Sequence, residues 1–189
     1  MTDKNVSIMN IGSMGYLPQV FKKIENEKKL NIVYLGGSIT MGCNATKTEL
    51  RYVDRSAKWW QTNFPDAEIS YFNAGIGATT SQFGVARVQE HVLDKQPDLV
   101  FVEFSVNDSS SPLFMETYES LVRRLLKAES VKAVVLINNL FYDTGTNAQG
   151  IHNAIGLHYD LPIVSVRNYI FPEIQLGNVC LADYTADML

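Results

Sequence analysis

The sequence has few of the residues that bind metal ions or carry redox chemistry. Among 189 residues it contains three histidines and two cysteines, Cys43 and Cys180. The two cysteines lie far apart and match no zinc-binding spacing. We therefore expect neither a metal site nor a redox site. We expect the cysteines to be two small buried thiols, with a single disulfide between them as the alternative.

Three further absences narrow the class of protein. No apolar run approaches the roughly 20 residues that span a bilayer, so no membrane span is predicted. The net charge is −4, which argues against a nucleic-acid partner because phosphate binding needs a basic surface. Asp3, Asn5 and Asn10 interrupt the N-terminal stretch that a secretion signal would keep apolar. We therefore expect no export signal and, in its absence, a cytoplasmic location.

What the chain does contain is a regular alternation of strand and helix patterns. Hydrophobic residues make up 46% and charged residues 19% of the sequence, as in ordinary globular proteins. Residues 1–15 show no period and are expected to form an irregular arm. The remaining patterns predict strands at 31–36, 67–73, 98–105, 131–137 and 161–166, and helices at 17–29, 52–64, 81–95, 115–129 and 149–159. This alternation predicts one α/β domain over residues 1–189, with a five-stranded parallel sheet between two layers of helices.

Three of the predicted strands end in loops that carry reactive or hydrogen-bonding groups. Ser38 follows a pair of glycines after the first strand, and Gly77 and Ala78 follow the second. Asn107 follows the third strand. In an open parallel sheet, ligands bind in the crevice beyond the carboxyl ends of the strands, so these loops are expected to meet. A serine hydroxyl can attack an ester, and N–H groups with an amide side chain can stabilise the resulting oxyanion.

Three short motifs at these loops resemble the first three sequence blocks of the SGNH, or GDSL-like, hydrolases. They are residues 36–40 (Gly-Gly-Ser-Ile-Thr), 73–78 (Asn-Ala-Gly-Ile-Gly-Ala) and 105–108 (Ser-Val-Asn-Asp), in the family's order and spacing. The resemblance implies a flavodoxin-like α/β/α fold and a serine esterase that needs no cofactor and no metal. It also implies that Ser38 is the nucleophile and that Asn107 binds the oxyanion. The chain looks most like the bacterial carbohydrate-esterase branch, which implies a small-molecule or glycan acyl-ester substrate, with acetyl as the expected acyl group.

The chain departs from the family pattern at three positions. Ala78 stands where the family usually has the block-two glycine, whose N–H is the backbone oxyanion donor, with the N–H of Gly77 as the neighbouring candidate. Alanine is tolerated there provided that its φ angle is negative. Gly37 replaces a common aspartate and Ser105 a common glycine. Neither replacement removes a catalytic group.

The family's fourth block is Asp-x-x-His, in which the aspartate orients the histidine that deprotonates the serine. By resemblance Asp187 is the candidate orienting acid, and its histidine would follow Leu189, the last residue given. We expect the chain as given to lack this base and the final helix of the fold, and therefore to be impaired. For the three histidines present, we expect surface or half-buried structural roles, since a base must reach the hydroxyl within about 3 Å. They are His91, His152 and His158.

Two other functions stay open on the sequence alone. The lack of a base favours a hydrolase-like domain that binds glycan without turning it over. Gly75 and Gly77 also match the start of a dinucleotide-binding fingerprint, which makes a nucleotide domain the weaker alternative. Against it, Thr80 takes the third glycine position, and a helix near Lys95 falls where the fingerprint expects an acidic residue.

Features that would set substrate choice are less distinct. The loops at 44–52, 109–114 and 139–150 are expected to shape the pocket, without identifying the acyl group or the alcohol. Trp59 and Trp60 could form a carbohydrate platform, although packing of at least one of them against the sheet is favoured because aromatic burial dominates cores. No pattern in the sequence indicates an oligomeric state.

Overall fold

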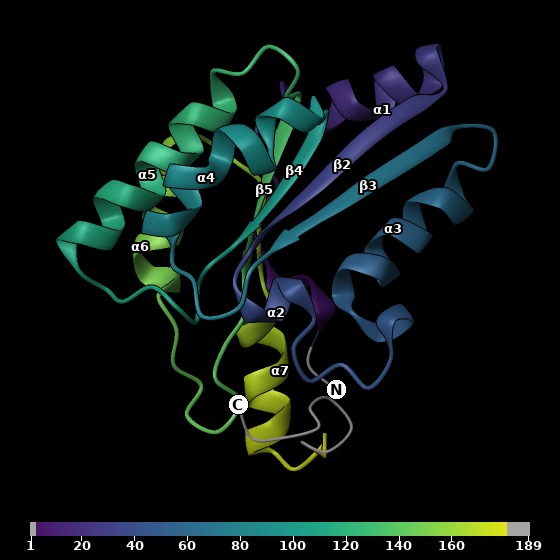
Figure 1. The fold of residues 1–189 in the computed structure, drawn as a ribbon. Coiled ribbons are helices and arrows are strands. Elements are labelled where there is room, and N and C mark those ends of the chain that lie inside the picture. Colours follow the sequence, from purple (N-terminus) through teal and green to yellow (C-terminus); the bar gives the residue numbers. More distant parts are fainter. Residues whose placement is uncertain (1–2, 181–189) are drawn as a thin grey trace.

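The computed structural model describes residues 3–180 and shows a central sheet with helices on both faces (Figure 1). The described strands are β1 (Ile8–Asn10), β2 (Lys29–Gly36), β3 (Glu68–Gly75), β4 (Leu99–Glu103), β5 (Ala133–Asn138) and β6 (Ile163–Ser165). They lie in the order β1-β6-β5-β4-β2-β3, and the pairs formed among β2 to β6 are all parallel. The predicted α/β/α architecture is confirmed, with six strands in place of five.

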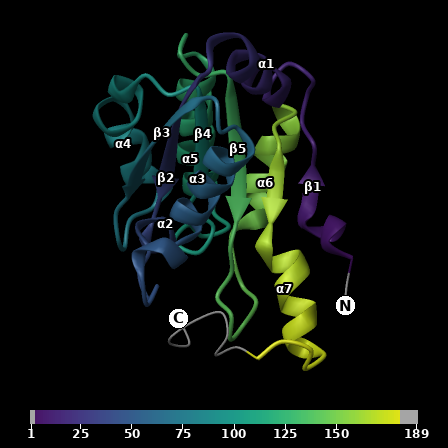
Figure 2. The same cartoon turned by 90° about the vertical axis from the view of Figure 1, so that its right-hand side faces the viewer.

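The additional strand comes from the segment that was expected to be an irregular arm. A 3-10 turn at Lys4–Ser7 leads into β1, which pairs antiparallel with β6 at the edge of the sheet (Figure 2). Asn10 Nδ2 strengthens this edge by donating a hydrogen bond to Leu161 O at 2.9 Å. A strand of three residues is too short to show a two-residue period in the sequence. The prediction of an irregular arm was therefore wrong at β1.

Helices from different parts of the chain cover the two faces of the sheet. They are α1 (Leu17–Glu27), α2 (Ser38–Met41), α3 (Tyr52–Asn63), α4 (Ser81–His91), α5 (Pro112–Leu126), α6 (Gln149–His158) and α7 (Val166–Gln175). α4, α5 and α6 lie on one face, whereas α1 and α3 lie on the other (Figure 1). α2 and α7 directly follow the carboxyl ends of β2 and β6. The expected absence of the family's final helix concerns a part of the chain outside the described residues.

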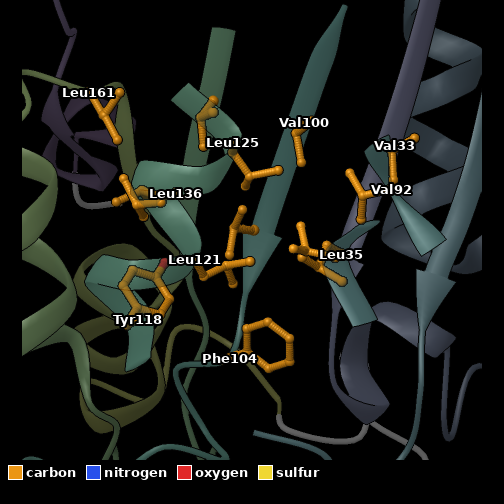
Figure 3. Packing of buried hydrophobic residues seen from close by; sticks show 14 of the residues in the cluster. Val33, Leu35, Val92, Val100, Phe104, Tyr118, Leu121, Leu125, Leu136 and Leu161 are labelled. Carbon is orange, nitrogen blue, oxygen red and sulfur yellow. The ribbon is translucent and has the colours of Figure 1, made fainter. Parts of the chain in front are cut away.

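Each face of the sheet has its own hydrophobic core. Val33 and Leu35 of β2 belong to the cluster beneath α4, α5 and α6, where Val33 lies beside Val92 and Leu35 lies closer to Phe104 (Figure 3). Ile32 and Tyr34, which alternate with them, belong to the cluster beneath α1 and α3. Both sides of β2 are therefore buried, and this is why the strand is an unbroken apolar run without an alternating polar face.

Four side chains test finer predictions about burial. Trp60 is buried against the second cluster and stacks on Phe64, with Trp59 half exposed, so the prediction that at least one tryptophan packs is confirmed. Cys43 and Cys180 are both exposed and both free. The expectation of buried thiols was therefore wrong, because both residues lie in exposed loops, and no disulfide joins them. No helix within residues 3–180 is long and apolar enough to cross a membrane.

The strand order fixes where a ligand site can form. The connection from β2 to β3 passes through α3 on one face, and the connection from β3 to β4 passes through α4 on the other. The winding direction therefore changes between β2 and β4, whose last residues, Gly36 and Glu103, are neighbours in register. In open α/β sheets the ligand crevice lies outside the carboxyl ends of the strands at such a switch point.

Candidate active site

A tight turn at the end of β2 places Ser38 at the switch point. β2 ends at Gly36, and Ser38 is the first residue of the one-turn helix α2. A Cβ added to Gly36 would lie 2.1 Å from Thr40 Oγ1 and 2.5 Å from the carbonyl oxygen of Glu103. These distances are too short for real contacts, so only glycine permits this path of the backbone. Ser38 is left half-buried, and its hydroxyl makes no hydrogen bond within residues 3–180.

The three loops predicted to meet do lie against one another. A Cβ on Gly37 would lie 2.3 Å from Asn107 Oδ1 and 3.3 Å from the carbonyl oxygen of Thr79. The nucleophile turn, the loop after β3 and the loop after β4 therefore touch at a single residue. The N–H of Ile76 also donates a hydrogen bond to Gly36 O at 3.1 Å, which ties the first two loops together.

Several hydrogen-bond donors at this junction have no partner among residues 3–180. They include the backbone N–H groups of Ser38, Gly77 and Ala78, which do not donate to any backbone or side-chain acceptor there. Asn107 Nδ2 likewise makes no hydrogen bond in the described part of the chain. Asn107 Oδ1, the atom that lies against Gly37, is also buried without a partner in the described part of the chain. Backbone N–H groups and an amide side chain without partners can stabilise an oxyanion during acyl transfer.

The backbone at Ala78 does not meet the condition stated for alanine. Its φ angle is +56°, in the left-handed region, and not negative. An L-residue with a Cβ costs roughly 1–2 kcal/mol in this conformation, which explains why the family usually has glycine there. Ala78 is exposed, so its methyl group meets no obstacle, and its N–H remains a free donor.

A buried pair of side chains anchors the loop that carries Asn107. Asp108 Oδ2 lies 3.1 Å from His152 Nε2, and Asp108 Oδ1 accepts a hydrogen bond from the N–H of Ser81 at 2.9 Å. The imidazole stacks on Tyr118 with 3.7 Å between ring centroids. Burial lowers the pKa of His152, so the ring is neutral at pH 7 and donates through Nε2 to the carboxylate. Asp108 thereby fixes the loop to α4 and α6.

This geometry also settles the positions of the three histidines. His152 is fully buried, so its expected surface or half-buried placement was wrong, although its contacts are structural as predicted. His91 is half-buried with Nδ1 3.3 Å from Arg87 Nη1, and His158 is exposed and lies edge-on to Tyr159. None of the three forms a hydrogen bond with Ser38. Asp187, the candidate orienting acid, lies outside the described residues.

A model of the GDSL-like Lipase/Acylhydrolase family matches residues 34–168, which span the three loops. The chain belongs to this family. A comparison with curated protein sequences finds no significant match.

Among solved structures, the chain is similar to a two-domain esterase (CEX) active on acetylated mannans, with 45% identity and a TM-score of 0.96. That match covers 99% of this chain and 50% of CEX, so the chain spans about half the length of that esterase. It also shares the fold of Axe2, an acetylxylan esterase from Geobacillus stearothermophilus, with 20% identity, a TM-score of 0.68 and 85% of each chain covered.

Glu103 is a buried carboxyl group directly beneath the GDSL-like site. Its Oε1 accepts hydrogen bonds from the N–H and the Oγ of Ser105, each at 3.0 Å, whereas Oε2 has no partner within the described residues. Burial raises the pKa of Glu103 from 4.5 to about 7. Between these two values the folded state holds a proton that the unfolded state has lost, so the Glu103 contribution to stability falls as the pH rises from 4.5 to 7.

Replacing Glu103 with glutamine should remove this loss of stability at higher pH. Glu103→Gln keeps the acceptor for Ser105 and mimics the protonated carboxyl group. We expect a free energy of unfolding on the order of 1–3 kcal/mol higher than that of the unchanged chain above pH 7, and no difference below about pH 4.5. Urea denaturation at several pH values measures it. The buried His152 contributes a slope of opposite sign below pH 6.5, but it cancels in the difference between the two proteins. A difference that does not vary with pH would contradict this assignment.

Proposed function

We propose that this chain is the catalytic part of a serine esterase that removes acetyl groups from carbohydrate. The observation that carries the proposal is the contact of three loops at Gly37, with an accessible Ser38 hydroxyl and unpaired donors around it. Family membership supports the reaction class. The 45% identity with an esterase active on acetylated mannans supports an acetylated polysaccharide as the substrate class.

In the proposed mechanism, Ser38 Oγ attacks the acetyl carbonyl carbon and forms a tetrahedral intermediate. The N–H groups of Ser38 and of Ala78 or Gly77, with Asn107 Nδ2, bind the oxyanion. Collapse of the intermediate releases the sugar hydroxyl and leaves an acetyl group on Ser38, which water then removes in a second round.

The proton acceptor in this mechanism is a histidine three positions after Asp187, oriented by that aspartate. The same pair type occurs in Axe2, of which catalytic mutants were solved with a serine, an aspartate or a histidine replaced by alanine. In Axe2 this aspartate and histidine are three positions apart. None of the three histidines forms a hydrogen bond with Ser38 in the described structure, so the proposed mechanism does not assign the base to them.

The test is acetate release by the chain continued in its natural reading frame past Leu189. We expect it to hydrolyse p-nitrophenyl acetate and to release acetate from acetylated mannan. Chemically deacetylated mannan serves as the blank. Binding of acetylated mannan without any release of acetate would instead favour the non-catalytic glycan-binding domain.

The dinucleotide alternative meets a physical obstacle at the start of α4. A bound pyrophosphate would need the free N–H groups of this helix N-terminus. Asp108 Oδ1 already accepts the N–H of Ser81 there, and a fixed carboxylate would repel a phosphate. We therefore do not favour a nucleotide cofactor at this loop.

Asn107 provides a graded test of the oxyanion site. Asn107→Ala in the extended chain should lower kcat about 100- to 1000-fold and leave KM nearly unchanged, because the amide acts mainly on the developing charge. Asn63→Ala is the matched control, since Asn63 is exposed on α3 and donates only to Trp59 O in its own helix. A change confined to KM would assign Asn107 to substrate binding.

A further inference from the structure

Arg87 is a buried cation whose side chain reaches the carboxyl ends of two strands. It lies on α4 and is 6% exposed. Its Nη1 donates a hydrogen bond to the carbonyl oxygen of Ala74 at 2.6 Å, and its Nη2 donates one to that of Gly36 at 3.1 Å. Gly36 is the last residue of β2, and Ala74 is the next-to-last residue of β3.

These two carbonyl groups begin the loops that form the proposed oxyanion site. Ser38 lies two residues after Gly36, and Ala78 lies four residues after Ala74. The planar guanidinium holds both carbonyls at once, so it fixes the distance between the nucleophile turn and the loop with the Ala78 N–H. Catalytic donors must keep their position closely, because a misplacement of about 1 Å can cost about 100-fold in rate.

The charge of Arg87 has no carboxylate partner within residues 3–180. No ion pair of the described chain includes it, and its other neighbours are His91 Nδ1 and the ring of Phe83. Burial lowers the pKa of Arg87 to about 10, which still leaves it charged at pH 7. A buried cation without a carboxylate partner is costly to the folded protein. A favourable effect of its electric field on another group would account for its presence. An oxyanion that develops at the end of these strands would be stabilised by that field, because the charge of a buried group is only weakly screened.

We propose that Arg87 is a positioning residue for acyl transfer, which holds the Ser38 turn and the Ala78 loop in register and favours the oxyanion through its charge. This inference rests on the proposed esterase function. Arg87 itself touches neither the serine hydroxyl nor the substrate in this arrangement. It acts through the backbone of the two loops and through the electric field of its charge.

The experiment compares three variants of the extended chain on p-nitrophenyl acetate. Arg87→Met removes both the hydrogen bonds and the charge, and should lower kcat per folded molecule about 100-fold with KM within about threefold. Arg87→Lys keeps the charge, and its kcat should be about tenfold higher than that of Arg87→Met. Arg124→Met is the control, because Arg124 also donates to a backbone carbonyl, that of Val85, but is exposed and on α5. It should keep kcat within about twofold.

Thermal unfolding of each variant separates positioning from stability. A folded Arg87→Met with unchanged kcat would overturn the inference, as would a loss of stability without loss of kcat per folded molecule. If Arg87→Met does not fold at the assay temperature, Arg87→Lys decides alone, and an unchanged kcat in it overturns the inference. Failure of the proposed function looks different: the extended chain with Arg87 intact would itself be inactive.

Discussion

Extending the chain through a histidine three positions after Asp187 should raise the rate of p-nitrophenyl acetate hydrolysis at least about 1000-fold. In the proposed mechanism, Ser38 without its base would retain only what the oxyanion donors and substrate binding provide, the residual catalysis that remains when a triad member is removed. None of the three histidines in the 189-residue chain can replace it by its present contacts. His152 is bound to Asp108 inside the protein, and His91 contacts Arg87.

Two controls make this comparison specific. In the extended chain, alanine in place of the added histidine should return the rate to that of the 189-residue chain. Alanine in place of Asp187 should lower kcat less, because the histidine is still present but no longer held in the correct tautomer. Equal and substantial turnover by the 189-residue chain and the extended chain would show that the base lies elsewhere.

Ser38→Ala in the extended chain should lower kcat by about a millionfold, close to the limit of detection. The hydroxyl supplies the bond-forming atom, and the loss of a triad serine is of this size in other hydrolases. The free energy of unfolding should stay nearly unchanged, since the Ser38 hydroxyl makes no hydrogen bond within residues 3–180.

Ser70→Ala is the matched control for this substitution. Ser70 lies near the amino end of β3, away from the crevice, where its hydroxyl contacts Asn31 Oδ1 at 3.2 Å. Its removal should leave kcat unchanged. Acetyl-ester hydrolysis that persists in Ser38→Ala would mean that another group or a bound water performs the attack.

The central strands could be predicted from the sequence because both of their faces are buried. Residues 32–35 of β2 alternate between two cores, which forces an unbroken apolar run that no helix within residues 3–180 shows. The short edge strand β1 and the helix α7 lacked such a signal. β1 has three residues, and α7 contains Pro172 after its first turn, which weakens a helical pattern.

The convergence of the three loops could also be anticipated, since parallel strands end at one edge of the sheet. The contacts that support this edge of the sheet from below could not be predicted from the local sequence. The φ angle of Ala78 follows from the path of the loop, and the burial of His152 from the way α6 packs over Asp108. In the sequence, Arg87 is an ordinary helix residue. Its contacts with the ends of β2 and β3 are visible only in the folded structure. Each of these depends on residues distant in the chain.

The most direct test of the whole account is the intact mass of the extended chain after treatment with a fluorophosphonate. This reagent transfers its phosphoryl group to an activated serine and releases fluoride, and the adduct places its oxygen in the oxyanion site. We predict a single adduct on Ser38, located by peptide mapping, and no adduct on Ser38→Ala. An unlabelled protein, or a label that maps to another residue, would contradict the claim that these three loops form an acyl-transfer site.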